Sequence, residues 1–120
     1  MPSPTTPVSI HPYFKVRAGN LPAAKALLAD FIARTRTEPG VLQYEFTLCD
    51  DTIFCREAYR DADALLAHVG NVGAQVQQML GLAELARLEI HGPAAELAKL
   101  KGPLAGMNPT WYTYECGLAR

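Results

Sequence analysis

Hydrophobic and polar positions alternate along some segments of the chain and recur at helical spacing along others. Alternation is typical of half-buried strands, whereas recurrence every three to four residues is typical of amphipathic helices. Alternation and β-forming residues predict strands over residues 10–17, 41–48, 53–59, 86–91 and 110–116. Helical spacing predicts helices over residues 21–36, from 61 to about 76, and over 93–101.

Residues that cap, stop or weaken helices separate these segments. Asn20 and Asp61 suit helix N-caps, because their side chains can accept hydrogen bonds from free backbone amides. The first helix must end near Pro39, since a residue before proline avoids the helical region. Gly70 and Gly73 weaken the second helix and predict a kink or a break there.

The predicted order is strand, helix, strand, strand, helix, strand, followed by a further helix and strand. A βαββαβ order is typical of ferredoxin-like α+β folds, in which both helices cover one face of an antiparallel sheet. The 120 residues suffice for one domain with a buried core but not for two. We therefore predict a single domain over residues 10–120, preceded by a flexible arm over residues 1–9.

Composition and charge argue against nucleic acid and membrane partners. The net charge is -1 and the chain contains no basic run, so nucleic acid binding is not expected. No apolar run approaches the roughly 20 residues that a membrane helix needs. The first residues also lack the basic and hydrophobic regions of a secretory signal.

The cysteines and two of the histidines carry no recognisable motif. Cys49, Cys55 and Cys116 form neither an even disulfide set nor a CxxC pair, so we expect free thiols and a cytoplasmic location. His11 and His91 have no partner at metal-ligand spacing, and no metal site is predicted.

The two central strands are expected to form a hairpin with a two-residue turn at residues 50–51. Side chains alternate between the faces of a sheet, so this turn sets which residues share a face. The turn would pair Cys49 with Thr52, and on the helix-covered face it would then pair Phe46 with Cys55, Tyr44 with Glu57, and Leu42 with Tyr59. Glu45 would lie opposite Arg56 on the other face as an ion pair. Glu57 is then a lone carboxylate in an apolar, aromatic layer.

His68 is expected to meet Glu57. Glu57 lies roughly 13 Å back from Asp61 along its strand, and His68 lies roughly 10 Å back along the returning helix. The two side chains could therefore line one cavity with Tyr44 and Tyr59. Burial would raise the pKa of Glu57 and His68 would lower it, which suits proton transfer near neutral pH. A purely structural buried pair is the alternative, and a one-residue slip would move Glu57 to the other face.

The segments EPGVLQYEF and FCREAYRDADALLAHV resemble the antibiotic biosynthesis monooxygenase (ABM) family of dimeric α/β-barrel proteins. The resemblance covers roughly residues 10–92 and leaves residues 93–120 as a C-terminal extension. The positions that carry it are Pro39, Gly40, Tyr44, Glu57, Tyr59, Asp61, Ala64, Leu65 and His68.

The resemblance implies a homodimer whose subunits each hold a pocket between sheet and helices. Members of the family oxidise aromatic phenols or quinols with molecular oxygen and without a metal or flavin cofactor. His68 would then be the base or proton shuttle, and Glu57 and Tyr59 would orient it or the substrate. The side chains expected to bind the substrate are Tyr44, Phe14, Phe46, Leu65 and Val72.

Other functions occur on the same scaffold. The resemblance also admits an isomerase of small carbonyl compounds, or a non-catalytic binding or assembly protein with Tyr112 and Tyr114 at an interface. Haem degradation is not expected, because Phe14 and Tyr59 stand where the haem-degrading branch has Asn and Trp.

Overall fold

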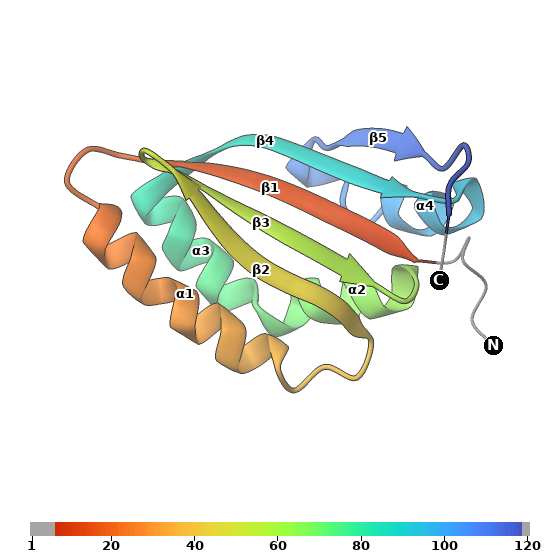
Figure 1. Cartoon of the computed structure of the whole chain (residues 1–120), viewed down its shortest axis with the longest axis horizontal. Coiled ribbons are helices and arrows are strands. Elements are labelled where there is room, and N and C mark those ends of the chain that lie inside the picture. Colours follow the sequence, from red (N-terminus) through yellow and green to blue (C-terminus); the bar gives the residue numbers. More distant parts are fainter. Residues whose placement is uncertain (1–6, 119–120) are drawn as a thin grey trace.

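A five-stranded sheet carries all the helices on one of its faces (Figure 1). The computed structural model describes residues 7–118. The strands are β1 (Val8–Val16), β2 (Val41–Cys49), β3 (Thr52–Tyr59), β4 (Ala83–Gly92) and β5 (Thr110–Thr113). The helices are α1 (Leu21–Thr35), α2 (Ala62–Asn71), α3 (Gly73–Leu82), α4 (Ala94–Lys101) and the single 3₁₀ turn η1 (Ala105–Met107).

The spatial order of the strands is β2-β3-β1-β4-β5. The pairs among β1, β2, β3 and β4 are all antiparallel, whereas β5 pairs with β4 in parallel. This order and the two helical crossovers confirm the ferredoxin-like α+β fold, to which α4 and β5 are added.

Several element boundaries differ from the prediction. β1 begins at Val8, two residues earlier than expected, while the rest of the predicted arm, residues 1–6, lies outside the described residues. β4 begins at Ala83, and a register shift in its pairing with β1 falls between Tyr13 and Phe14. This irregularity leaves Ala86 exposed, although strict alternation along the strand would put it on the same face as Leu88 and Ile90, which are buried.

The second predicted helix is broken, as the two glycines indicated. α2 ends at Asn71 and α3 begins at Gly73, with Val72 between them in a non-helical conformation. Asp61 caps α2, because its carboxylate accepts a hydrogen bond from the amide of Ala64 at 2.8 Å. Asn20 stands at the N-cap of α1, but its side chain donates to the carbonyl of Leu82 instead of accepting from the helix.

The hairpin register is confirmed over most of its length. Tyr44 pairs with Glu57, and the pairs nearer the turn also match the prediction. The pairing of Leu42 with Tyr59 was wrong, because a register shift near the start of β2 turns the Leu42 side chain outward, where it is 59% exposed. Glu45 lies opposite Arg56, yet its carboxylate accepts a hydrogen bond from Gln43.

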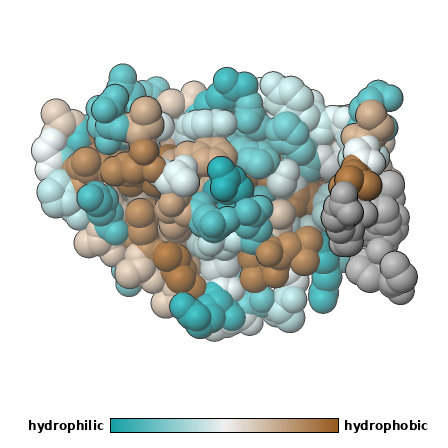
Figure 2. Space-filling model, viewed as in Figure 1, coloured by the Kyte–Doolittle hydropathy of each residue, from teal (hydrophilic) through white to brown (hydrophobic). Residues whose placement is uncertain are grey.

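Two clusters of buried side chains form the core between sheet and helices. The α4-side cluster lies under α2 and α4 and includes Val8, Ile10, Tyr59, Leu65, Ile90, Leu97, Leu100 and Leu104. The α1-side cluster lies under α1 and α3 and includes Phe14, Leu27, Phe31, Ile53, Val72 and Met79. On the face seen in Figure 2, hydrophobic residues form separate patches among hydrophilic ones. No helix within residues 7–118 is both long and apolar enough to cross a membrane.

Gly40 brings the loop before β2 against α2. A Cβ built on Gly40 would lie 2.6 Å from the Cβ of Ala64, which is closer than two nonbonded carbon atoms approach. We therefore expect Gly40→Ala to lower the free energy of unfolding by about 2 kcal/mol, because the crowded side chain forces the backbone to shift. Urea unfolding followed by fluorescence would measure the difference.

A double-variant cycle tests the cause of that loss. Gly40→Ala combined with Ala64→Gly removes the close contact, and this pair should be destabilised by less than the two single effects added together. Gly102→Ala is the matched control, since a Cβ at Gly102 meets nothing within 4 Å. Strict additivity in the cycle would contradict the steric explanation.

Candidate active site

A cavity of about 550 Å³ lies between the helix-covered face of the sheet and helices α1, α2 and α3. Apolar side chains from these elements form most of its wall. Polar groups gather where β2 and β3 meet α2: Tyr44, Cys55, Glu57 and His68. The cavity is therefore an apolar chamber with a polar end that contains four titratable side chains.

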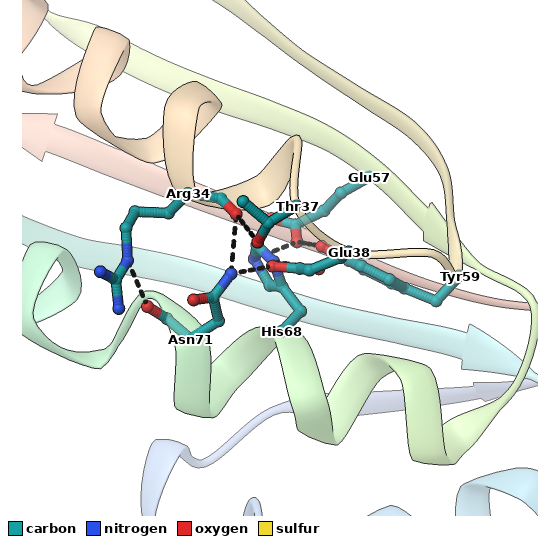
Figure 3. Close-up of polar contacts among 7 residues, drawn as sticks. All are labelled: Arg34, Thr37, Glu38, Glu57, Tyr59, His68 and Asn71. Atoms are coloured by element: carbon teal, nitrogen blue, oxygen red, sulfur yellow. Dashed lines mark hydrogen bonds and ion pairs between the residues drawn. The ribbon is translucent and has the colours of Figure 1, made fainter.

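His68 stands between two carboxylates at this polar end (Figure 3). Its Nδ1 lies 2.9 Å from Oε2 of Glu38, and its Nε2 lies 3.3 Å from Oε1 of Glu57. The side chains of His68 and Glu57 are only 5% and 6% exposed. Tyr59 completes the chain of contacts by donating a hydrogen bond to Oε1 of Glu57 at 2.6 Å. The predicted meeting of Glu57, Tyr59 and His68 is thus present, with Glu38 as an additional member.

Glu38 was not predicted from the sequence as part of the site. It lies in the loop between α1 and β2, and its Oε2 accepts a hydrogen bond from Nδ2 of Asn71 at 2.8 Å. Asn71 also donates to the carbonyl of Arg34, whose side chain donates back to the carbonyl of Asn71. These bonds join the ends of α1 and α2, as Figure 3 shows, and hold Glu38 beside His68.

The position of one proton follows from these contacts. We assign the hydrogen of the neutral imidazole to Nδ1, from which it can be donated to Oε2 of Glu38. A neutral His68 then presents a lone pair from Nε2 toward Glu57, and this contact is favourable only if Glu57 is protonated. The alternative places the proton on Nε2 and leaves Glu57 ionised. Both arrangements hold the same number of protons, so His68 and Glu57 share one between them.

Burial favours the arrangement with the proton on Glu57. Desolvation raises the pKa of the Glu57 carboxyl from its ordinary 4.5 to about 7, although hydrogen bonds from Tyr59 and Cys55 act in the opposite direction. Desolvation also lowers the pKa of His68, and Glu38 opposes that effect. Near neutral pH the pair therefore consists of a neutral imidazole and a carboxyl group that is close to its titration midpoint.

The remaining polar groups at this end stay protonated. Burial raises the pKa of the Tyr44 hydroxyl and of the Cys55 thiol, and the nearby Glu57 adds to both effects. Burial likewise raises the pKa of Tyr59. Cys55 is consequently a thiol with weak nucleophilic character, because the thiolate is the reactive form.

Most of the side chains that were expected to bind substrate do line the cavity: Tyr44, Phe14, Phe46 and Val72. Leu65 does not, and its expected place in the wall needs correction. It is fully buried in the α4-side cluster, because it lies nearly one helical turn before His68, where α2 packs toward α4. Tyr59 also belongs to that cluster and acts on the cavity only through Glu57.

Metal ligands do not converge in the described part of the chain. Within residues 7–118, no three His, Cys, Asp or Glu side chains are arranged to hold a metal ion. All three cysteines are unpaired thiols, with Cys55 buried and the other two exposed.

Comparison with known proteins identifies the family. The profile described as "Antibiotic biosynthesis monooxygenase" matches residues 7–78, which is more than half of the chain. The chain belongs to this family. Among solved structures, MupZ from Pseudomonas fluorescens is 40% identical, with a TM-score of 0.92 and coverage of 96% of this chain and 95% of MupZ. No functionally curated protein matches the chain.

Other structures share the ABM fold over a shorter length. Rv0793 from Mycobacterium tuberculosis is 27% identical with a TM-score of 0.65, and the match covers 73% of this chain and 95% of Rv0793. A Caulobacter crescentus protein assigned to the antibiotic biosynthesis monooxygenases is 22% identical with a TM-score of 0.66, over 72% of this chain and 88% of its own. Both leave more than a quarter of this chain unmatched, whereas MupZ matches nearly all of it.

Proposed function

We propose that this ABM-family protein is a cofactor-independent monooxygenase that oxidises a phenol or quinol with molecular oxygen. The observation that carries the proposal is the contact between His68 and Glu57 at the polar end of an otherwise apolar cavity. This pair can accept and return a proton near neutral pH, and the apolar wall suits a hydrophobic ring.

In the proposed reaction, Nε2 of His68 takes the proton of a substrate hydroxyl after its shared proton has moved to Glu57. The resulting anion is electron-rich and gives its electrons to oxygen. Conversion of a phenol to its para-quinone consumes one O₂, places one oxygen atom in the product and releases one water. The substrate supplies all the electrons, so the balance requires no further reductant. Tyr59 holds Glu57 in place by its hydrogen bond.

Oxygen uptake with a panel of substituted phenols and quinols tests this function. The proposal requires uptake above the rate of spontaneous oxidation, together with a product that carries one atom from labelled O₂. A protein that binds members of the panel but consumes no oxygen with any of them would contradict it.

An isomerase is the second candidate, favoured by one specific observation. The Glu57 carboxyl and the His68 imidazole stand 3.3 Å apart in the cavity, and burial raises the pKa of Glu57 to about 7, so an acid and a base are both present for proton transfer between two carbon atoms. Rearrangement of a small carbonyl compound under anaerobic conditions would distinguish this activity from oxygenation. A non-catalytic binding protein would bind the same ligands and change none of them.

We also propose the homodimer that the family resemblance implies, together with a cytoplasmic location that suits unpaired thiols. The sheet face opposite the helices carries a row of partly exposed aromatic rings. The rings of His11 and Phe54 stack at 5.9 Å, and Tyr13 lies 4.7 Å from Phe54. On β4 and β5, His91 and Tyr112 stack at 4.5 Å. A second sheet packed on this face would remove these rings from water.

Phe54→Glu should convert this dimer to a monomer, because it places a charge at the centre of the aromatic row. Sedimentation velocity on both proteins would measure the change in mass. Ala29→Glu is the control, since it adds the same charge at an exposed position of α1 on the opposite side of the sheet. A monomeric wild-type protein, or a Phe54→Glu variant that remains dimeric, would contradict the proposed interface.

A further inference from the structure

The C-terminal segment forms part of the cavity wall. Gly106 and Met107, which belong to η1, line the same cavity as His68 and Glu57. Both residues lie beyond residue 78, where the match to the family profile ends. The extension therefore adds a wall that the matched part of the domain does not contribute.

Both ends of this segment are fixed to the rest of the molecule. Before η1, Leu100 and Leu104 are buried in the α4-side cluster, and the amide of Leu104 donates to the carbonyl of Leu100 at 2.9 Å. After η1, β5 pairs with β4, with Trp111 opposite Ile90. Met107 itself packs against the α4-side cluster. Its side chain is thus held in place as part of the wall.

The cavity runs across the sheet from a polar end to an apolar one. Its polar groups come from β2, β3 and α2, whereas β4 contributes Leu85 and Leu88. Two strand spacings separate β3 from β4, so the cavity extends roughly 10 Å in this direction. Gln77 of α3 and Gly106 of η1 line the cavity and are also exposed, which places its mouth between α3 and η1.

We propose that the substrate is a phenol or quinol with an extended alkyl tail, and that Met107 selects for that tail. The hydroxyl head would meet His68 at the polar end, as in the proposed function on which this inference rests. The tail would lie along Leu85 and Leu88 and pass beneath Met107 toward the mouth. The aliphatic lining beyond the polar end offers an alkyl chain no competing hydrogen bonds.

Binding of meta-alkylphenols with ethyl, butyl, hexyl and octyl chains, whose para position stays free for oxygenation, tests the proposal without catalysis. Trp111, the only tryptophan of the chain, supplies a fluorescence signal near η1, and calorimetry supplies an independent measurement. Wild-type affinity should rise about three- to fourfold for each added methylene that enters the cavity. Met107→Ala should weaken octylphenol binding about tenfold while leaving ethylphenol binding unchanged, and Met107→Leu should restore it.

The controls separate this inference from the proposed function. Tyr112→Ala alters the same C-terminal segment on the far side of the sheet and should leave the dependence on chain length intact. Affinity that does not rise with chain length, or an equal loss for ethyl- and octylphenol in Met107→Ala, would overturn the role of Met107. Chain-length-dependent binding without oxygen uptake would reject the oxygenase function and retain the tail site.

Discussion

His68→Gln should lower the turnover rate at least about hundredfold, because general base catalysis contributes a factor of 10² to 10⁴. Glutamine keeps hydrogen-bonding groups near Glu38 and Glu57 but cannot accept and return a proton near neutral pH. Alanine is the poorer choice, since it would remove one polar contact from each of two buried carboxyl groups and leave an empty space between them. The expected defect lies in the chemical step, so ligand affinity should change little.

Single-turnover oxidation under saturating substrate measures that step directly. His91→Gln is the matched control, since His91 stacks on Tyr112 away from the cavity and should retain full turnover. Circular dichroism would verify that both variants are folded. Turnover by His68→Gln within a few fold of the wild type would remove His68 from the mechanism and leave the cavity as a binding site.

The location of the site was predictable because two regular periods determine it. Strand alternation and a short turn placed Tyr44 opposite Glu57, and that register is observed. The rise per residue of strand and helix brought His68 to the height of Glu57, and their side chains are in contact. Regular backbone geometry converts sequence spacing into distance, so such predictions succeed within continuous elements.

Features outside the regular elements were not predictable in the same way. Glu38 reaches His68 from a loop, where no period relates sequence spacing to direction. The outward position of Leu42 and the exposure of Ala86 both arise from register irregularities, which reverse the expected alternation locally. Gly40 could be recognised as a conformationally permissive residue, but its contact with Ala64 depends on how the loop packs against α2.

The proton shared by His68 and Glu57 predicts a second large effect, which is a change in the pH dependence of the free energy of unfolding. In the folded protein, Glu57 is protonated up to a pH of about 7 because of its raised pKa, and His68 stays neutral below its ordinary 6.5. Unfolding reverses these preferences, since the exposed carboxyl ionises above 4.5 and the exposed imidazole is protonated below 6.5. Where the folded pair holds its proton on Glu57 and the unfolded chain holds it on His68, both states bind one proton, so the contribution of the pair to stability changes little with pH.

Each single variant should reveal the pH dependence that comes from the one side chain that remains. In His68→Gln, the folded protein holds a proton on Glu57 that the unfolded chain releases above pH 4.5. As the pH rises from 4.5 to 7, the free energy of unfolding should therefore fall by about 1.4 kcal/mol per pH unit, or about 3 kcal/mol in total. In Glu57→Gln, only the unfolded chain binds a proton at His68 just below pH 6.5. The free energy of unfolding should therefore decrease as the pH falls below 6.5, which is the opposite slope.

Urea unfolding across pH 4.5 to 7.5, followed by Trp111 fluorescence, would measure both slopes relative to the wild type. Subtraction of the wild-type curve removes the groups that titrate alike in all three proteins. Opposite slopes would establish that the folded state holds the proton on Glu57 in preference to His68. Slopes of the same sign would mean that the folded state does not favour the proton on Glu57, and the proposed route of the substrate proton through Nε2 to Glu57 would then lose its basis.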